Sequence, residues 1–150
     1  MSSGAGHLDS AYVRLGSDKK VELIRKVPLF SHLSRKQLAQ VAKVADEIDL
    51  REGKEMTREG APGREFFVIL EGSADVRKGG RKINSLQPGD FFGEIALVTS
   101  VPRTATVAAT SPVRALVVTD RSFRHLLEES PDIKTRVMQA MAARLAPETL

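Results

Sequence analysis

The most informative part of the chain reads Phe92-Gly93-Glu94-Ile95-Ala96-Leu97-Val98-Thr99-Ser100-Val101-Pro102-Arg103-Thr104-Ala105-Thr106. Gly93 removes a side chain at a place where a ligand could approach the backbone. Residues 94–98 can form one short helical turn, whose first N–H groups lack acceptors within the helix and therefore suit an anion. Because Pro102 ends this segment, it sets the approach of Arg103, whose planar fork of donors fits a phosphate.

An acid completes this group of side chains. The carboxylate of Glu94 can accept a hydrogen bond from a vicinal hydroxyl such as a ribose 2′-OH. A helix N-terminus, an arginine and a carboxylate within so short a stretch fit a ligand that carries one phosphate and one sugar hydroxyl. The plainer interpretation is a turn between two strands, with a surface ion pair between Glu94 and Arg103.

The stretch resembles the phosphate-binding cassette of cyclic nucleotide-binding domains, whose pattern is F-G-E-[LI]-A-L, a short variable gap and then P-R-[ATS]-A-[TS]. The chain matches every specified position. Glu59-Gly60-Ala61-Pro62-Gly63 also resembles the E-G-[DE]-P-G turn of that family, and Leu70-Glu71-Gly72 resembles its L-E-G hairpin. The similarity covers about residues 19–146, and in layout the chain is most similar to the domain of bacterial cyclic-nucleotide-gated potassium channels.

The resemblance implies how a ligand would be held. Glu94 and the backbone of Gly93 would bind the ribose 2′-OH, Arg103 would pair with the cyclic phosphate, and backbone N–H groups would add donors to it. The predicted ligand-binding residues are Gly93, Glu94, Ile95, Ala96, Arg103 and Thr104. The base would rest on apolar barrel residues, because the chain contains no tryptophan.

Two further positions bear on the base. Thr104 could accept a hydrogen bond from the guanine 2-amino group, yet threonine also occurs in cyclic AMP binders, so we expect cyclic AMP as ligand and keep cyclic GMP open. The bacterial channels place a basic residue of the last helix over the base. Counting from the start of that helix, we assign this position to Met138, which could cover the base by dispersion but carries no charge. A core methionine is the equal alternative.

Composition narrows the class of protein. The 150 residues fit one domain with a sizeable core, and 41% of them are hydrophobic. Cysteine is absent, which excludes disulfides and thiol catalysis, and we expect a cytoplasmic protein with no transmembrane segment. His7, His32 and His125 lie far apart, so neither a metal site nor a metal cofactor is expected. With no second base or nucleophile beside Glu94, we expect no enzyme.

The remaining pattern predicts an α+β fold: an eight-stranded antiparallel β jelly-roll barrel with N-terminal helices, the short cassette helix and two C-terminal helices. Ser17 would cap a helix over residues 18–26, and Ser34 with Gln37 forms a capping box for the next. Asp120 and Ser130-Pro131 would start the last two. The expected strands cover residues 47–51, 54–58, 65–70, 73–78, 82–86, 105–109 and 113–119. We divide the chain into a flexible tail over 1–16, the domain over 17–146 and a C-terminal end over 147–150.

We therefore expect a cyclic nucleotide sensor whose C-terminal helices move on binding and which regulates an unknown effector domain or protein. One alternative is a structural module that no longer binds. Another is the remnant of a transcription regulator of the catabolite-activator type, but too few residues follow Pro131 to form a DNA-binding unit. Residues 14–43 carry an excess of Lys and Arg, which a nucleic acid, an anionic lipid or an acidic partner could meet, although a solvated helix surface is the plainer interpretation.

Overall fold

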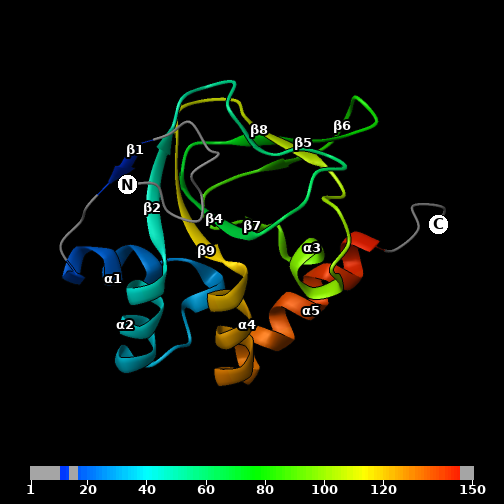
Figure 1. Cartoon of the computed structure of the whole chain (residues 1–150). Coiled ribbons are helices and arrows are strands. Elements are labelled where there is room, and N and C mark those ends of the chain that lie inside the picture. Colours follow the sequence, from blue (N-terminus) through cyan, green and yellow to red (C-terminus); the bar gives the residue numbers. More distant parts are fainter. Residues whose placement is uncertain (1–10, 14–16, 146–150) are drawn as a thin grey trace.

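The computed structural model of the protein describes residues 11–13 and 17–145. Within these residues two antiparallel sheets face each other, and the helices gather at one end of them (Figure 1). The first sheet has the order β1 (Ala11–Val13), β2 (Asp46–Leu50), β9 (Val113–Thr119), β4 (Glu65–Glu71) and β7 (Phe91–Phe92). The second has the order β3 (Glu55–Thr57), β8 (Thr106–Ala109), β5 (Ala74–Lys78) and β6 (Arg81–Leu86).

This arrangement confirms the predicted fold, in which the strands β2 to β9 form an eight-stranded jelly roll. Two short strands were not predicted, because segments of two or three residues are too short to show alternation. One of them, β7, pairs with β4. The other, β1, corrects the prediction of a flexible tail at Ala11–Val13: it pairs with β2 and so covers the free edge of that strand. The rest of the predicted tail and residues 147–150 lie outside the described residues.

Strand β4, which lies between β9 and β7, divides the apolar interior into two clusters. Its side chains alternate, so Phe66 and Val68 pack among the helices while Phe67 and Ile69 fill the barrel. Phe66 stacks on Phe123 of α4 at a centroid distance of 4.5 Å, and Phe67 stacks on Phe92 at 4.9 Å. The strand is therefore buried on both faces, as its continuous apolar run predicted.

Two helices and a turn precede the barrel. They are α1 (Ser17–Arg25), the 3₁₀ turn η1 (Pro28–Phe30) and α2 (Arg35–Val44). The predicted capping box of α2 is confirmed: the hydroxyl of Ser34 accepts from the backbone N–H of Gln37 at 3.2 Å, and the side chain of Gln37 accepts from the N–H of Ser34 at 2.9 Å. Helix α1 begins at Ser17, one residue earlier than expected.

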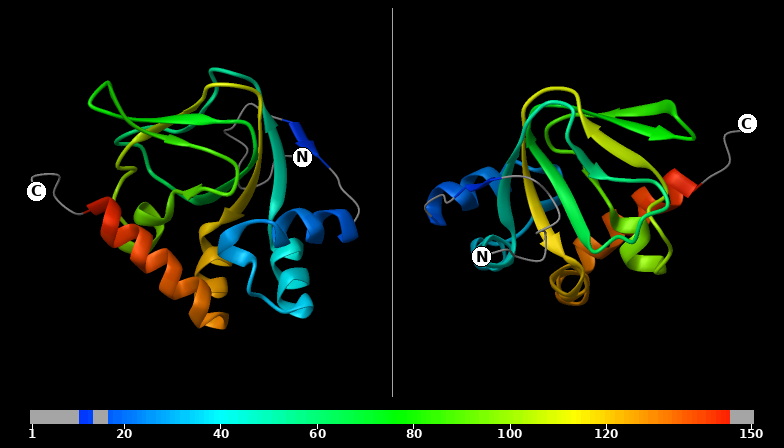
Figure 2. Two further views of the ribbon diagram at one scale, coloured as in Figure 1. Left: turned by 180° about the vertical axis from the view of Figure 1, so that it is seen from behind. Right: turned by 45° about the horizontal axis from the view of Figure 1, so that its top comes forward.

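Three helices follow the barrel strands β7 and β9: α3 (Glu94–Thr99), α4 (Asp120–Glu129) and α5 (Pro131–Leu145). The cap of α4 is Thr119 and not Asp120, since the hydroxyl of Thr119 accepts from the N–H of Ser122 and Asp120 is already helical. Figure 2 shows α5 rising from α4 toward α3, and α5 contacts both of these helices. No helix among the described residues is long and apolar enough to cross a membrane.

Candidate ligand-binding site

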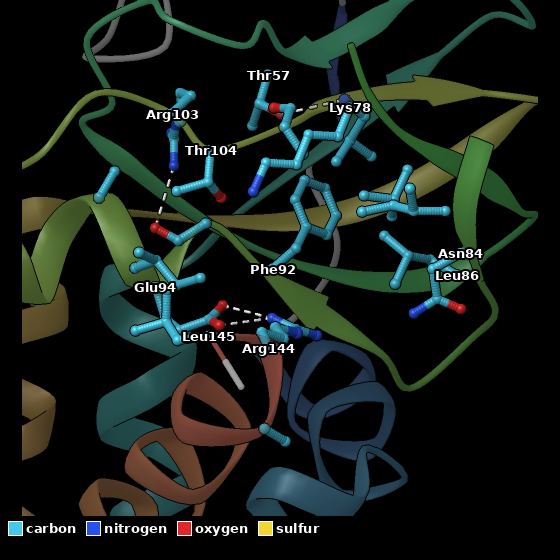
Figure 3. A pocket seen from close by; sticks show the side chains of 18 residues that line it. Thr57, Lys78, Asn84, Leu86, Phe92, Glu94, Arg103, Thr104, Arg144 and Leu145 are labelled. Carbon is cyan, nitrogen blue, oxygen red and sulfur yellow. Dashed lines mark hydrogen bonds and ion pairs between the residues drawn. The ribbon is translucent and has the colours of Figure 1, made fainter. Parts of the chain in front are cut away.

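A cavity of about 410 Å³ opens between α3, the β5–β6 hairpin and the last turn of α5 (Figure 3). All six predicted ligand-binding residues line it: Gly93, Glu94, Ile95, Ala96, Arg103 and Thr104. The volume lies in the range of pockets that hold small molecules. Strand β7, which precedes Gly93, pairs with β4, and the loop that carries Arg103 and Thr104 leads into β8. The first and last residues of the cassette therefore line the same cavity.

The opposite wall of the cavity is largely apolar. It is formed by Val76, Ile83, Leu86, Phe92 and Val107. Val76 and Leu86 come from the paired strands β5 and β6, whereas Val107 comes from β8 on the other side of β5. Ile83 lines the cavity and is 50% exposed, so its side chain offers apolar surface that a ligand could cover.

Arg103 is fixed deep in the site by backbone carbonyl groups. Its Nη1 donates to the carbonyl oxygen of Gly93 at 3.1 Å, and its Nη2 donates to that of Glu65 at 2.8 Å. The carboxylate of Glu65 lies 3.6 Å from Nη2, and both side chains are about 95% buried, at 5% and 4% exposed. Burial lowers the pKa of the Arg103 guanidinium, and the charges of Glu65 and Glu94 oppose that shift.

Two glycines make room for this arginine. A Cβ atom on Gly63 would lie 2.4 Å from Nε of Arg103, so the guanidinium packs directly on the Gly63 backbone. Gly93 has a φ of +96°, and a Cβ there would lie 2.7 Å from the Glu65 carbonyl oxygen and 2.9 Å from Nη1 of Arg103. The sequence indicated that the missing side chain of Gly93 leaves room for a ligand. In the structure, the Arg103 guanidinium lies in this space.

Glu94 is fully buried, and its partner is Arg144 of α5. Nη1 of Arg144 lies 2.6 Å from each carboxylate oxygen of Glu94, and its Nη2 donates to the carbonyl oxygen of Phe91 at 2.6 Å. The guanidinium also lies over the Phe91 ring, 5.2 Å from its centroid. The plainer interpretation of the cassette, a surface ion pair between Glu94 and Arg103, is therefore wrong, since Glu94 is 0% exposed and bonds to a different arginine.

Met138, the predicted lid over the base, does not line the cavity. It is partly buried on α5, whereas the α5 residues at the cavity are Ala143, Arg144 and Leu145. Arg144 lies six positions after Met138, which is about 9 Å along a helix. The signal that could have found Arg144 is its charge, because Arg144 is the basic residue in the last turn of α5 and the resemblance to the bacterial channels implied a basic residue on the last helix.

Lys78 and Thr57 also line the cavity and were not predicted. The hydroxyl of Thr57 donates to the carbonyl of Ala105 at 3.0 Å and accepts from the N–H of Val107 at 3.1 Å, so it ties β3 to the start of β8. A second cavity, of about 470 Å³, lies behind Arg103 and is lined by Glu65 and the β3 residues. No cluster of three acidic or histidine side chains in the described part of the chain could hold a metal ion.

Comparison with known proteins gives consistent matches. The family model for the cyclic nucleotide-binding domain matches residues 47–130. A cAMP-dependent protein kinase regulatory subunit from Mycosarcoma maydis is 44% identical over 118 residues, covering 71% of this chain and 22% of that protein. A protein described as a potassium channel from Rhodopseudomonas palustris is 34% identical over 126 residues, covering 81% of this chain and 30% of that protein.

Solved structures share the fold. One, of Sp-2Cl-cAMPS bound to the second cyclic nucleotide-binding domain of a protein kinase A regulatory subunit, is 26% identical with a TM-score of 0.74, and the match covers 86% of this chain and 91% of that one. The chain spans less than a third of the length of the two curated relatives above, at 22% and 30%.

Proposed function

The chain belongs to the family of cyclic nucleotide-binding domains, and we propose that its cavity binds cyclic AMP as the sensor of a larger regulatory protein. One observation carries this proposal: a buried arginine and a buried carboxylate, Arg103 and Glu94, line a single cavity of about 410 Å³ together with the other cassette residues. A cyclic nucleotide needs this combination, since it presents one negative phosphate and one free ribose hydroxyl beside an apolar purine.

The two charged side chains define the orientation of the ligand. The cyclic phosphate would lie at the Arg103 end, where the backbone N–H groups of Ala96 and Thr104 add donors. The ribose 2′-OH would donate to Glu94, whose carboxylate has acceptor sites beyond those that Arg144 uses. The purine would then extend along the apolar wall toward Ile83, where its burial would cover that exposed side chain.

We expect a modest preference for cyclic AMP over cyclic GMP, of about tenfold or less. Thr104 lines the cavity, and its hydroxyl could accept from the guanine 2-amino group. One neutral hydrogen bond is worth about 0.5–1.5 kcal/mol, which limits the discrimination that this position can give. The curated relative from Mycosarcoma maydis is a cAMP-dependent subunit by its description, which supports cyclic AMP as the first ligand to test.

We further propose that the domain regulates and does not catalyse. Glu94 is the acid among the described residues that line the cavity, and it is already paired with Arg144. The described relatives are a kinase regulatory subunit and a channel, in which this kind of domain is one part of a longer protein. The effector and the cytoplasmic location remain predictions, as does a role for the basic residues over 14–43.

Isothermal titration of the purified chain with cyclic AMP, cyclic GMP and linear 5′-AMP tests the proposal. We expect saturable binding of both cyclic nucleotides near the micromolar range, which corresponds to about −8 kcal/mol, and much weaker binding of 5′-AMP, whose open phosphate has a different shape and charge. No heat with either cyclic nucleotide, from a chain with a cooperative thermal transition, would favour the alternative of a structural module that does not bind.

A further inference from the structure

Lys78 is the last residue of β5 and lines the cavity. No motif in the sequence predicted that it would. Val76 precedes it by two residues, so the two side chains lie on the same face of the strand, and both line the cavity. Figure 3 shows the Lys78 side chain entering the cavity with its ammonium directed toward Thr104. Thr104 follows Arg103, so the ammonium points to the end of the cavity where the proposed function places the phosphate.

The charges around the cavity do not cancel without a ligand. Three cationic side chains line it: Lys78, Arg103 and Arg144. The carboxylate of Glu94 lies at 2.6 Å from Arg144, and the carboxylate of Glu65, behind the cavity, lies at 3.6 Å from Arg103. No carboxylate in the described part of the chain forms an ion pair with Lys78.

The uncompensated charge therefore belongs to Lys78. A net charge of one positive unit in the cavity matches the single negative charge of a cyclic phosphate. Arg103 contributes donors to that phosphate, but much of its charge is already satisfied by the two carbonyl groups and by Glu65. An ammonium acts on phosphate as a point charge, so it can pair with an exocyclic oxygen without the fixed geometry that a guanidinium needs.

We propose that Lys78 is a second phosphate-binding residue, which supplies the net positive charge that the cassette lacks. The inference rests on the proposed function, because it names a further contact for the same ligand. It commits to the phosphate and not to the base: a phosphate contact is common to all cyclic nucleotides, whereas a contact with the purine 6-position would distinguish guanine and hypoxanthine, which accept there, from adenine, which donates.

The test uses three variants of the whole chain. Lys78→Met removes the ammonium and keeps most of the apolar stem, and Lys78→Arg keeps the charge. Arg81→Met is the matched control, because Arg81 pairs with Lys78 across the β5–β6 hairpin, is exposed, and does not line the cavity. Each variant is titrated with cyclic AMP, cyclic GMP and cyclic IMP at low and high salt, and its thermal transition is recorded. Both positions are exposed, so no variant should unfold.

We expect Lys78→Met to lose about tenfold in affinity for all three nucleotides and to show a weaker salt dependence, while Lys78→Arg and Arg81→Met stay within about twofold of the parent. An unchanged affinity in Lys78→Met, with the parent binding normally, would overturn this inference alone. A loss confined to cyclic GMP and cyclic IMP would overturn the phosphate assignment, since the ammonium would then meet the base. A parent chain that binds none of them would remove the proposed function and this inference with it.

Discussion

Arg144, in the last turn of α5, bonds through Nη1 to both carboxylate oxygens of Glu94, at 2.6 Å each, and so joins the end of the chain's last described helix to the first residue of the cassette helix. The two residues are 50 positions apart in the sequence. Glu94 is also the predicted acceptor of the ribose hydroxyl, so in the proposed complex one carboxylate would contact the ligand while it holds α5. Any ligand that changes the hydrogen bonds of Glu94 can therefore act directly on that helix.

The first prediction concerns this ion pair. Arg144→Gln should lower the free energy of unfolding by about 1–2 kcal/mol, because it leaves the fully buried Glu94 without a cation; the cost stays below the usual range for buried pairs since Arg144 is one-third exposed, at 33%. Chemical denaturation measures this loss. The matched control is Lys134→Gln, an exposed residue of the same helix. Equal stability of the two variants would show that the pair contributes nothing.

The second prediction concerns Arg103. Arg103→Ala should weaken cyclic AMP binding by about 2–5 kcal/mol, since it removes the buried cation at the phosphate end. It also removes the cation that lies 3.6 Å from the buried carboxylate of Glu65, so the fold has to be checked by circular dichroism. Arg103→Lys separates the two effects: it retains a charge but cannot bond to the carbonyls of Gly93 and Glu65 together. Titrations in which both variants stay within about threefold of the parent would contradict the proposed role.

The third prediction uses two glycines that differ in what surrounds them. Gly63→Ala should displace the Arg103 guanidinium, because a Cβ there would lie 2.4 Å from Nε, and binding should weaken by about tenfold. Gly53→Ala meets nothing within 4 Å but has a φ of +89°, so it should cost about 1–2 kcal/mol of stability and leave the affinity unchanged. Calorimetric titration and thermal melts on both variants separate loss of affinity from loss of stability. An affinity loss in Gly53→Ala alone would contradict this account.

The fourth prediction concerns the choice of base. If Thr104 accepts from the guanine 2-amino group, Thr104→Ala should lower the affinity for cyclic GMP by about 0.5–1.5 kcal/mol and change that for cyclic AMP by less than about twofold. Competition binding of the two nucleotides measures both values. A parent chain that binds cyclic GMP more tightly than cyclic AMP would overturn the preferred ligand, and Thr104→Ala should in that case reverse the order.

The sequence predicted the parts of the site that depend on neighbours along the chain. The cassette lies on one short helix and its flanking turns, and Glu94 and Arg103 from its two ends line the same cavity. It did not predict Arg144, because the residue of α5 that reaches the cavity depends on where α4 directs that helix. The sequence likewise did not predict that Gly63 leaves space for Arg103. These two residues are brought together by the turn before β4, whose Gly60 and Ala61 form backbone hydrogen bonds with Arg103.

The fold, too, was predicted correctly where an element carries its own signal along the sequence. The continuous apolar run of β4 and the capping box of α2 are both signals contained in the elements themselves. The strands β1 and β7 have three and two residues, and they exist because β2 and β4 offer free backbone groups to them. Pairing of that kind is a property of the assembled sheet, which no local window of the sequence contains.

Movement of the C-terminal helices is the last prediction, and the packing gives it a route. Leu97 of the cassette helix is buried in one cluster with Phe123 of α4 and Val137 of α5. In addition, Nη2 of Arg124 in α4 donates to the carbonyl of Leu97 at 3.4 Å. A cassette helix drawn toward a phosphate would therefore move atoms that both helices contact, and close-packed contacts shift between discrete arrangements more readily than they deform.

Hydrogen exchange with and without cyclic AMP tests this route. We expect ligand to change protection over residues 120–145 as well as over 91–106, because Glu94 and Leu97 connect the cassette to α5 and α4. The ligand can shift the helices only by its differential affinity for the two arrangements. Arg144→Gln removes the connection through Glu94 and keeps the one through Leu97. This variant should therefore show a smaller protection change at the end of α5 and an unchanged protection change near Phe123. Protection changes confined to 91–106 in the parent chain would mean that the helices are fixed and that the domain binds its ligand passively.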